Sequence, residues 1–318
     1  MRCLSPRTVG FLADGKTISW SQKNYSKEYA TFQLPCSKCI ECRLEYARQW
    51  AVRCVHEAKM HKENSFITLT YSDENLKSSK LQYIDFQLFA KRLRKKIKKS
   101  DPDKKISIFV TGEYGEKTKR PHWHAIIFNW RPSDTIPLYK NERGDQVYTS
   151  GTLNELWPFG RSELGSVTFE SAGYVARYAA KKLVHGNDGT HDYNPISKKS
   201  SKNAIGKLFL ETYYKDIFNY GEVVLDNGTK STIPRYYEKW LQKNHPHDWI
   251  DYVTKLKASR LQAAEEKKQR QQAKIDDINN QRLKNNPRKG FLISSSAVRT
   301  KLINQRFKIL QKHLKGDI

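Results

Sequence analysis

The sequence predicts an α+β protein in which helices flank an antiparallel β-sheet. Three stretches rich in β-branched and aromatic residues are typical of strands, namely 65–71, 106–113 and 122–128. Apolar residues recur at helical spacing between them, as in 84–98. Because only a short polar turn separates the second stretch from the third, we expect these two to form a hairpin, which makes the sheet antiparallel.

The other expected elements follow from periodicity and from turn residues along the chain. They are short strands at 17–20 and 31–34, helices at 40–61 and 84–98, a short element at 153–159, a strand at 165–169, a helix at 171–184 with Ser171 as N-cap, a loop at 185–202, a helix at 208–218, a hairpin at 221–234 and a long basic helix at 250–283. Three parts are therefore expected: an N-terminal segment with a cysteine cluster and a helix (1–64), a core (65–240) and a basic helical C-terminal extension (241–318).

The charge balance points to a polyanionic partner. Lysine and arginine total 58 against 33 aspartate and glutamate, a formal net charge of +25. Residues 251–318 alone hold 17 basic and 6 acidic side chains. Such an excess attracts nucleic acid and opposes self-association of the chain. No apolar run is long enough to span or anchor in a membrane, and residues 1–10 lack the apolar region of a secretory signal, so we expect no membrane partner.

Five cysteines are present, and three of them follow one another at Cys36, Cys39 and Cys42. An odd count without a secretory signal argues against a disulfide framework and favours a reducing compartment. Three thiolates with Cys3 as a fourth ligand would suit a structural zinc ion. Free thiols are the alternative, because two Cys-x-x-Cys pairs at finger spacing are absent. Cys54 lies on the apolar stripe of its helix and is expected to be a buried small hydrophobe.

A candidate metal site lies in the predicted hairpin. His122 and His124 stand two residues apart in a strand, so both side chains point to one face and are able to hold a divalent cation. An isolated pair of this kind is more often just two surface histidines. Glu113 ends the preceding strand and would supply a carboxylate oxygen, the ligand that Mg²⁺ or Mn²⁺ prefers. Glu116 is the alternative third ligand, because the sequence does not fix the register.

A candidate nucleophile lies on the helix expected at 171–184. Tyr174 and Tyr178 are four residues apart and share a face, which Lys182 continues and from which Lys181 is offset. A phenol can attack phosphorus and hold DNA as a phosphotyrosine ester, and a nearby lysine would favour the phenolate or neutralise phosphate charge. By itself, this pattern is more typical of tyrosines packed at the rim of a core.

Taken together, these motifs resemble those of a known family. The segment FITLTY at 66–71, the HWH at 122–124 preceded by GEYG at 112–115, and the tyrosine pair followed by Lys181-Lys182 occur in that order. The set resembles the HUH endonuclease superfamily of rolling-circle initiators, and most closely the replication initiators of small single-stranded DNA phages of the microvirus group, particularly gokushoviruses. Shorter similar segments, such as LWPFG at 156–160, extend the resemblance over roughly residues 35 to 240.

The resemblance implies an HUH-like fold, with the histidine pair on a central strand and the tyrosine helix packed alongside. It implies an endonuclease in which Mg²⁺ or Mn²⁺ on His122, His124 and an acid polarises the scissile phosphate of origin single-stranded DNA. One tyrosine would keep the 5′ end as a phosphotyrosine, the free 3′ hydroxyl would prime rolling-circle replication, and the other tyrosine would later cleave again and allow rejoining. No phosphate loop of the GxxxxGK[ST] type is present, so a host helicase and polymerase in the bacterial cytoplasm are the expected partners.

Two other functions remain open from sequence alone. One is a relaxase or single-strand transposase of the same fold, although the paired tyrosines and the chain length favour the initiator. The other is a non-catalytic regulator that binds nucleic acid through a zinc site on Cys36, Cys39 and Cys42 and leaves the histidine pair idle.

Overall fold

The computed structural model describes residues 3–115, 118–141, 144–181, 196–201, 203–225, 228–285, 292–294 and 297–305, with the backbone only at 177–181. The chain divides into two compact units. One consists of Met1–Glu45 and Ser259–Lys315, and the other of Tyr46–Ala258 and Gly316–Ile318. The three-part division expected from the sequence remains a prediction.

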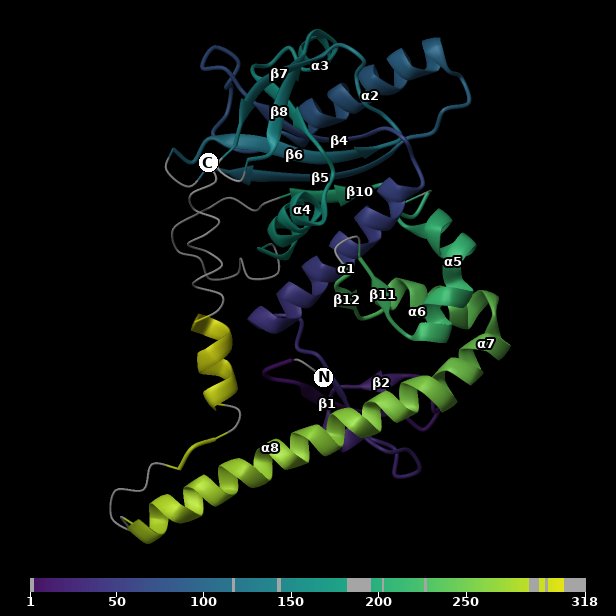
Figure 1. Cartoon of the computed structure of the whole chain (residues 1–318), viewed down its shortest axis with the longest axis vertical. Helices are drawn as coiled ribbons and strands as arrows, with labels where there is room; N and C mark the ends of the chain where they lie inside the picture. Colours follow the sequence, from purple (N-terminus) through teal and green to yellow (C-terminus); the bar gives the residue numbers. More distant parts are fainter. Residues whose placement is uncertain are drawn as a thin grey trace. The chain divides into compact units, whose positions relative to one another are not determined.

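Seven strands within the described part of the second unit form one sheet, in the order β10-β5-β6-β4-β9-β8-β7 (Figure 1). These strands are β4 (Asn64–Thr70), β5 (Ser107–Tyr114), β6 (Pro121–Phe128), β7 (Thr135–Lys140), β8 (Gln146–Ser150), β9 (Ser162–Gly165) and β10 (Ile196–Lys199). Each neighbouring pair is antiparallel. The predicted α+β class and the hairpin of β5 and β6 are therefore confirmed.

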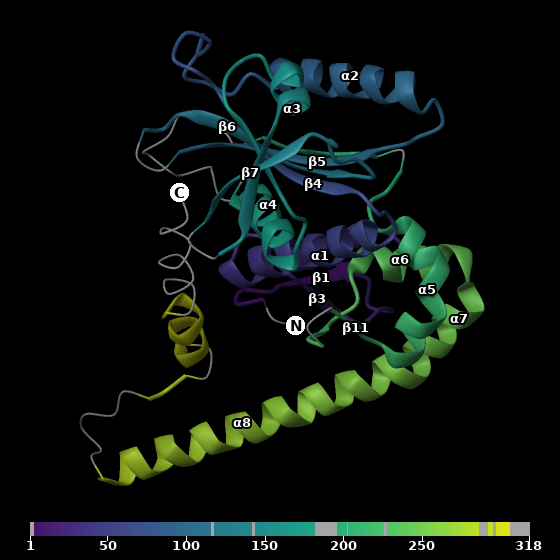
Figure 2. The same cartoon turned by 45° about the horizontal axis from the view of Figure 1, so that its top comes forward.

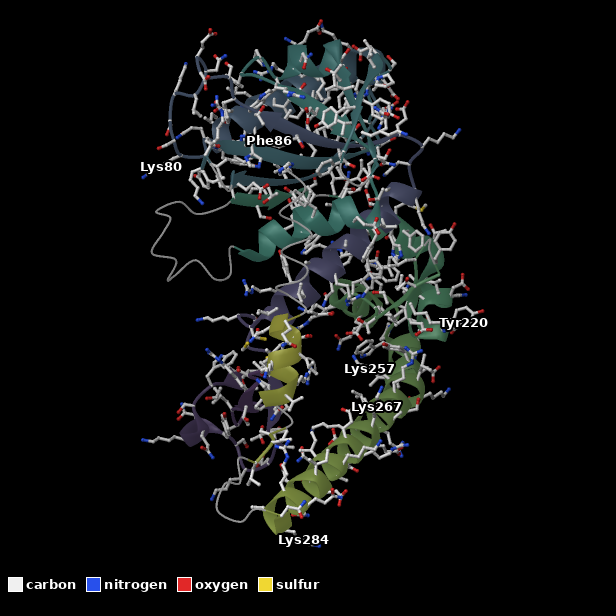
Figure 3. The ribbon with its side chains drawn as sticks, turned by 60° about the vertical axis from the view of Figure 1, so that its left-hand side comes forward. Lys80, Phe86, Tyr220, Lys257, Lys267 and Lys284 are labelled. Carbon is white, nitrogen blue, oxygen red and sulfur yellow. The ribbon has the colours of Figure 1, made fainter. Side chains whose placement is uncertain are left out.

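One face of this sheet packs under α2 (Tyr83–Ser100) and α3 (Gly151–Leu156), as Figures 1 and 2 show. The alternation of β6 sends Trp123, fully buried, to this face. Phe86 of α2, labelled in Figure 3, lies against it with the ring centroids 5.6 Å apart. Gly112 on β5 makes room for this indole, because a Cβ there would stand 2.6 Å from its Cζ3 atom. This face is thus a closely packed aromatic core that fixes the hairpin.

The opposite face packs against α1 (Ile40–Lys59) and α4 (Phe169–Lys181) (Figure 2). Ala172, Val175 and Ala176 are fully buried at helical spacing on α4. Because two of these three are alanines, the helix comes close to β5 and β6. The side chains of one turn of α4 are therefore held near those of β6.

Thr168, not Ser171, caps the start of α4, so the N-cap predicted from the sequence is wrong. The amide of Ser171 donates to the Thr168 hydroxyl at 3.1 Å, and the amide of Thr168 donates to the Ser171 hydroxyl at 2.8 Å. This reciprocal pairing is the capping-box arrangement, with Ser171 in the position usually taken by glutamate or glutamine.

A third apolar cluster joins α1 to the segment after the large sheet. It contains side chains from α5 (Lys207–Tyr220), β11 (Val223–Val224), β12 (Lys230–Ser231), α6 (Arg235–Asn244), α7 (Pro246–Asp251) and η2 (Tyr252–Lys257). The antiparallel β11 and β12 confirm the hairpin expected at 221–234, although Asp226 and Asn227 of its turn lie outside the described residues.

The first unit contains a small sheet, in the order β2-β1-β3, and the last long helix. Its elements are β1 (Arg7–Phe11), β2 (Ile18–Ser19), η1 (Gln22–Asn24), β3 (Phe32–Leu34) and α8 (Ala258–Asn285), which confirms the expected helical extension. No residue of α8 is buried, and Figure 3 labels Lys267 and Lys284 along it. Among the described helices, none is both long and apolar enough to cross a membrane.

Two expectations about secondary structure are wrong. The strand expected at 165–169 occurs earlier, as β9, and Phe169 already begins α4. The loop expected at 185–202 contains β10, which pairs with β5 and extends the sheet. Both errors have one cause: pairing with a neighbouring strand stabilises short polar segments whose own residues carry no strand signal.

Candidate metal and nucleophile site

Three side chains converge where β5 and β6 run side by side. Glu113 lies directly opposite His122 in the register, and His124 lies two residues further along β6 on the same face. The Glu113 Oε1 atom is 2.9 Å from His122 Nε2 and 2.8 Å from His124 Nε2. One carboxylate oxygen is thus shared by two imidazoles.

Burial shapes the electrostatics of this cluster. Burial raises the pKa of Glu113, but the hydrogen bonds and charges of His122 and His124 outweigh it, so that its pKa falls from 4.5 to about 2. Burial also lowers the pKa of His124, which favours the neutral ring. The cluster therefore presents an ionised carboxylate beside an imidazole that resists protonation, which are the protonation states that a metal ion requires.

The outer ring nitrogens hold both imidazoles in place. His122 Nδ1 lies 3.1 Å from the carbonyl oxygen of Arg120, which only accepts, so this nitrogen carries a proton. His124 Nδ1 lies 3.0 Å from the Thr68 hydroxyl on β4. Both contacts leave Nε2 directed at Glu113, and contacts of this kind orient histidine ligands in metal sites.

The same cluster fits a divalent cation. Around an octahedral ion with bonds of about 2.1 Å, adjacent ligand atoms lie about 3.0 Å apart, close to the two distances found here. The ligand atoms of the three residues all lie within 4.8 Å of one another. In addition, the buried Glu113 Oε2 atom has no hydrogen-bond partner among the described residues. A cation would satisfy this oxygen, since a buried carboxylate oxygen left alone is costly.

Tyr174 on α4 reaches the cluster from the helix side. Its hydroxyl donates to Glu113 Oε1 at 3.3 Å. Its ring stands edge-on to His124, with the centroids 5.1 Å apart, and edge-on to Phe66 at 6.4 Å. Phe66 in turn stacks on the His124 ring at 5.8 Å. The phenol oxygen is therefore held beside the two imidazoles and the acid by packed rings.

Other residues expected at this site lie partly or wholly outside the described part of the chain. Tyr178 and Lys181 belong to α4, but the structure does not describe their side chains. Lys182 and Glu116, the alternative third ligand, are not among the described residues. Their roles remain predictions.

Sequence reasoning missed a polar group on β9 beside the site. Glu163 pairs with Thr68 in the register, which puts it in the same cross-strand row as His124. The Arg161 guanidinium forms an ion pair with Glu163, and the Tyr139 hydroxyl donates to the same carboxylate at 3.1 Å. Arg161 and Tyr139 are exposed. Only strand pairing brings these residues to the site, so no sequence motif marks them.

A second cluster of potential metal ligands lies in the first unit. The sulfur atoms of Cys3, Cys36, Cys39 and Cys42 all lie within 4.8 Å of one another. Cys54, by contrast, is fully buried in the core under the sheet, as expected.

The comparisons with known proteins place the chain in a family. Residues 64–183, which hold the histidine pair and Tyr174, match a family model of replication-associated proteins of the ORF2 type. The chain is 48% identical to "Replication-associated protein VP4" of Bdellovibrio phage phiMH2K, over 99% of its own length and 100% of that protein. This chain belongs to the replication-associated proteins of bacteriophages.

Two further members of that family are similar. "Replication-associated protein ORF2" of Spiroplasma virus 4 is 32% identical, over 80% of this chain and 84% of that protein. "Replication-associated protein ORF4" of Chlamydia phage 1 is 36% identical, over 67% of this chain and 54% of that protein. A comparison with solved structures found no match.

Proposed function

We propose that this phage replication-associated protein is a replication initiator of the HUH type, a metal-dependent endonuclease that nicks single-stranded origin DNA with a tyrosine. One observation carries the proposal: the Tyr174 hydroxyl lies 3.3 Å from the carboxylate oxygen that both His122 and His124 contact. A nucleophile and a cation site within reach of one phosphate are what phosphoryl transfer requires.

The residues would share the work as follows. His122, His124 and Glu113 would hold Mg²⁺ or Mn²⁺, which when bound supplies charge to polarise the scissile phosphate. Tyr174 then attacks phosphorus through its phenol oxygen, and the bond from phosphorus to the 3′ oxygen breaks. The phenol loses its proton, and the leaving oxygen gains one to become a free 3′ hydroxyl. The 5′ phosphate stays on the tyrosine as an ester.

The ester conserves the energy of the broken bond, so rejoining needs no nucleotide cofactor. A 3′ hydroxyl attacks the phosphotyrosine and regenerates both a DNA strand and the phenol. Tyr178 would serve as the nucleophile for the second cleavage, after one round of rolling-circle synthesis. Unwinding and synthesis would fall to a host helicase and polymerase in the bacterial cytoplasm.

The exposed residues on β7 and beside β9 are suited to hold the substrate strand. The Arg161 guanidinium would contact phosphate, and the Tyr139 ring offers a surface on which a base stacks. Such contacts do not depend strongly on sequence, so they orient a single strand toward the metal site rather than select the nick position.

A covalent adduct on a denaturing gel tests the proposal. The full chain is incubated with Mn²⁺ and tiled single-stranded oligonucleotides that cover the genome encoding it. We expect one oligonucleotide to give a shorter free fragment and a protein-linked fragment. The double variant Tyr174→Phe with Tyr178→Phe should give neither, whereas Tyr213→Phe, a half-exposed tyrosine on α5, should behave as the wild type.

The same gel separates the rival functions. Binding of DNA without any nick or adduct would refute the endonuclease and favour a non-catalytic regulator. Adducts that persist in the double variant would refute the tyrosine assignment. Cleavage confined to double-stranded ends or transfer sites would favour a transposase or relaxase.

A further inference from the structure

The four clustered cysteines of the first unit lie at three separate points of the chain. Cys3 precedes β1, Cys36 follows β3, and Cys39 and Cys42 lie at the start of α1. The Cys36 and Cys42 sulfur atoms are 4.0 Å apart, and those of Cys3 and Cys39 are 3.9 Å apart. All four are free thiols, so no disulfide accounts for the convergence.

These distances match a tetrahedral metal site. Zinc–sulfur bonds of about 2.3 Å at tetrahedral angles put neighbouring sulfur atoms about 3.8 Å apart. A disulfide would need the two sulfur atoms at about 2.05 Å, roughly half of what is found. Four thiol sulfurs at the edge length of a tetrahedron leave no position open for water or substrate, which is the mark of a structural rather than a catalytic site.

The backbone around the cluster is arranged to support thiolates. The amide of Cys39 donates to Cys36 Sγ at 3.3 Å, the amide of Cys36 donates to Cys3 Sγ at 3.2 Å, and the amide of Leu4 donates to Cys39 Sγ at 3.5 Å. Ser37 adopts a left-handed conformation, with φ of 61°, which is uncommon for a residue with a side chain. The turn between Cys36 and Cys39 is thus folded around a sulfur atom, despite that conformational cost.

The surrounding segment has little apolar core of its own. Among described residues 3–45, the buried apolar side chains are only Cys3 and Val9, and none of the three apolar clusters draws a member from this segment. The sheet of β1, β2 and β3 is nevertheless ordered as antiparallel pairs. Small units that cannot bury enough apolar surface usually need a metal or disulfides to hold them.

We propose that Cys3, Cys36, Cys39 and Cys42 bind one structural Zn²⁺ ion, which fastens the start of the chain and the end of β3 to the first turn of α1. The ion replaces the missing apolar core of this small sheet. This site is separate from the cluster of Glu113, His122 and His124 and does not depend on the proposed nuclease activity.

Zinc content measured on the full chain tests this proposal. Protein expressed with added zinc is dialysed against metal-free buffer, and metal is counted by mass spectrometry. We expect one zinc per chain in the wild type, in Cys54→Ala and in the double variant His122→Ala with His124→Ala. We expect Cys39→Ser to lose it. A wild type without zinc, or zinc that disappears with the histidines and survives in Cys39→Ser, overturns the assignment.

Cobalt substitution keeps the test decisive if the cysteine variant fails to fold. The wild-type chain is refolded with Co²⁺ in place of zinc, and its absorption spectrum is recorded. Four thiolates in a tetrahedron give intense visible bands and thiolate-to-cobalt charge transfer in the near ultraviolet. We expect both in the wild type and in the histidine double variant. The weak spectrum of an octahedral oxygen and nitrogen site would overturn the proposal.

Discussion

The hydroxyl of Thr68 offers a direct test of whether His124 is a metal ligand. Thr68→Val removes the group that lies 3.0 Å from His124 Nδ1 and preserves the shape of the side chain. Valine suits a strand at least as well as threonine, so the loss of one neutral hydrogen bond should cost about 1 kcal/mol of folding stability or less. The fold should therefore survive the change.

The expected effect is on metal affinity. Removing a contact that orients a ligating histidine typically weakens metal binding by about 10- to 100-fold, or about 1.4–2.8 kcal/mol. Calorimetric titration with Mn²⁺ measures this, and the Mn²⁺ concentration that gives half-maximal adduct should rise in parallel. At saturating Mn²⁺ the adduct yield should largely recover, because the nucleophile is unchanged.

Thr70→Val is the matched control. Thr70 lies on the same face of β4, but its hydroxyl donates to the carbonyl oxygen of Arg161 at 3.2 Å instead of meeting an imidazole. Its Mn²⁺ affinity should stay within about 2-fold of the wild type, the usual range for a surface change. If Thr68→Val binds Mn²⁺ as tightly as this control, the reasoning that makes His124 a ligand fails.

Three further predictions concern charge, DNA contact and packing. In chelator, the stability advantage of the wild type over Glu113→Gln should fall by about 3 kcal/mol between pH 4.5 and about 2, because a carboxyl whose folded pKa is lowered loses its contribution as it is protonated; a constant difference, measured by urea unfolding, contradicts this. Arg161→Ala should weaken single-stranded DNA binding in fluorescence titrations and make its salt dependence shallower by roughly 0.7, whereas Lys96→Ala, on α2, should not; equal effects refute the surface. Gly112→Ala should lower stability by about 1–3 kcal/mol, because its Cβ presses on the core indole, and Gly165→Ala, with open space, should not; thermal melts that match would contradict the packing.

The long, strongly patterned elements were predictable from sequence. The apolar stripe of α2 and the alternation of β6 each carry enough buried residues to dominate local preference. For the same reason, the shared face of His122 and His124 followed from strand periodicity alone. Glu113 was identified as one of two acids, and it is the one that the register sets opposite His122.

The missed features depend on pairing between distant parts of the chain. Thr68 reaches His124 only because β4 pairs with β6 in a register that no local signal encodes. Glu163 joins the same row through β9, a strand of four residues. The N-cap of α4 was misassigned because both Thr168 and Ser171 have capping side chains, and their reciprocal hydrogen bonds decide which is outside the helix.

The measurement that tests the central claim most directly is the identity of the residue that carries DNA in the covalent adduct. Trypsin cuts after Arg161, Arg177 and Lys181, so Tyr174 and Tyr178 fall in different peptides, 162–177 and 178–181. After nuclease trimming, mass spectrometry should find the remaining nucleotide on 162–177, with fragment ions that locate it at Tyr174. A nucleotide found only on another peptide, or the absence of any modified peptide, would contradict the account.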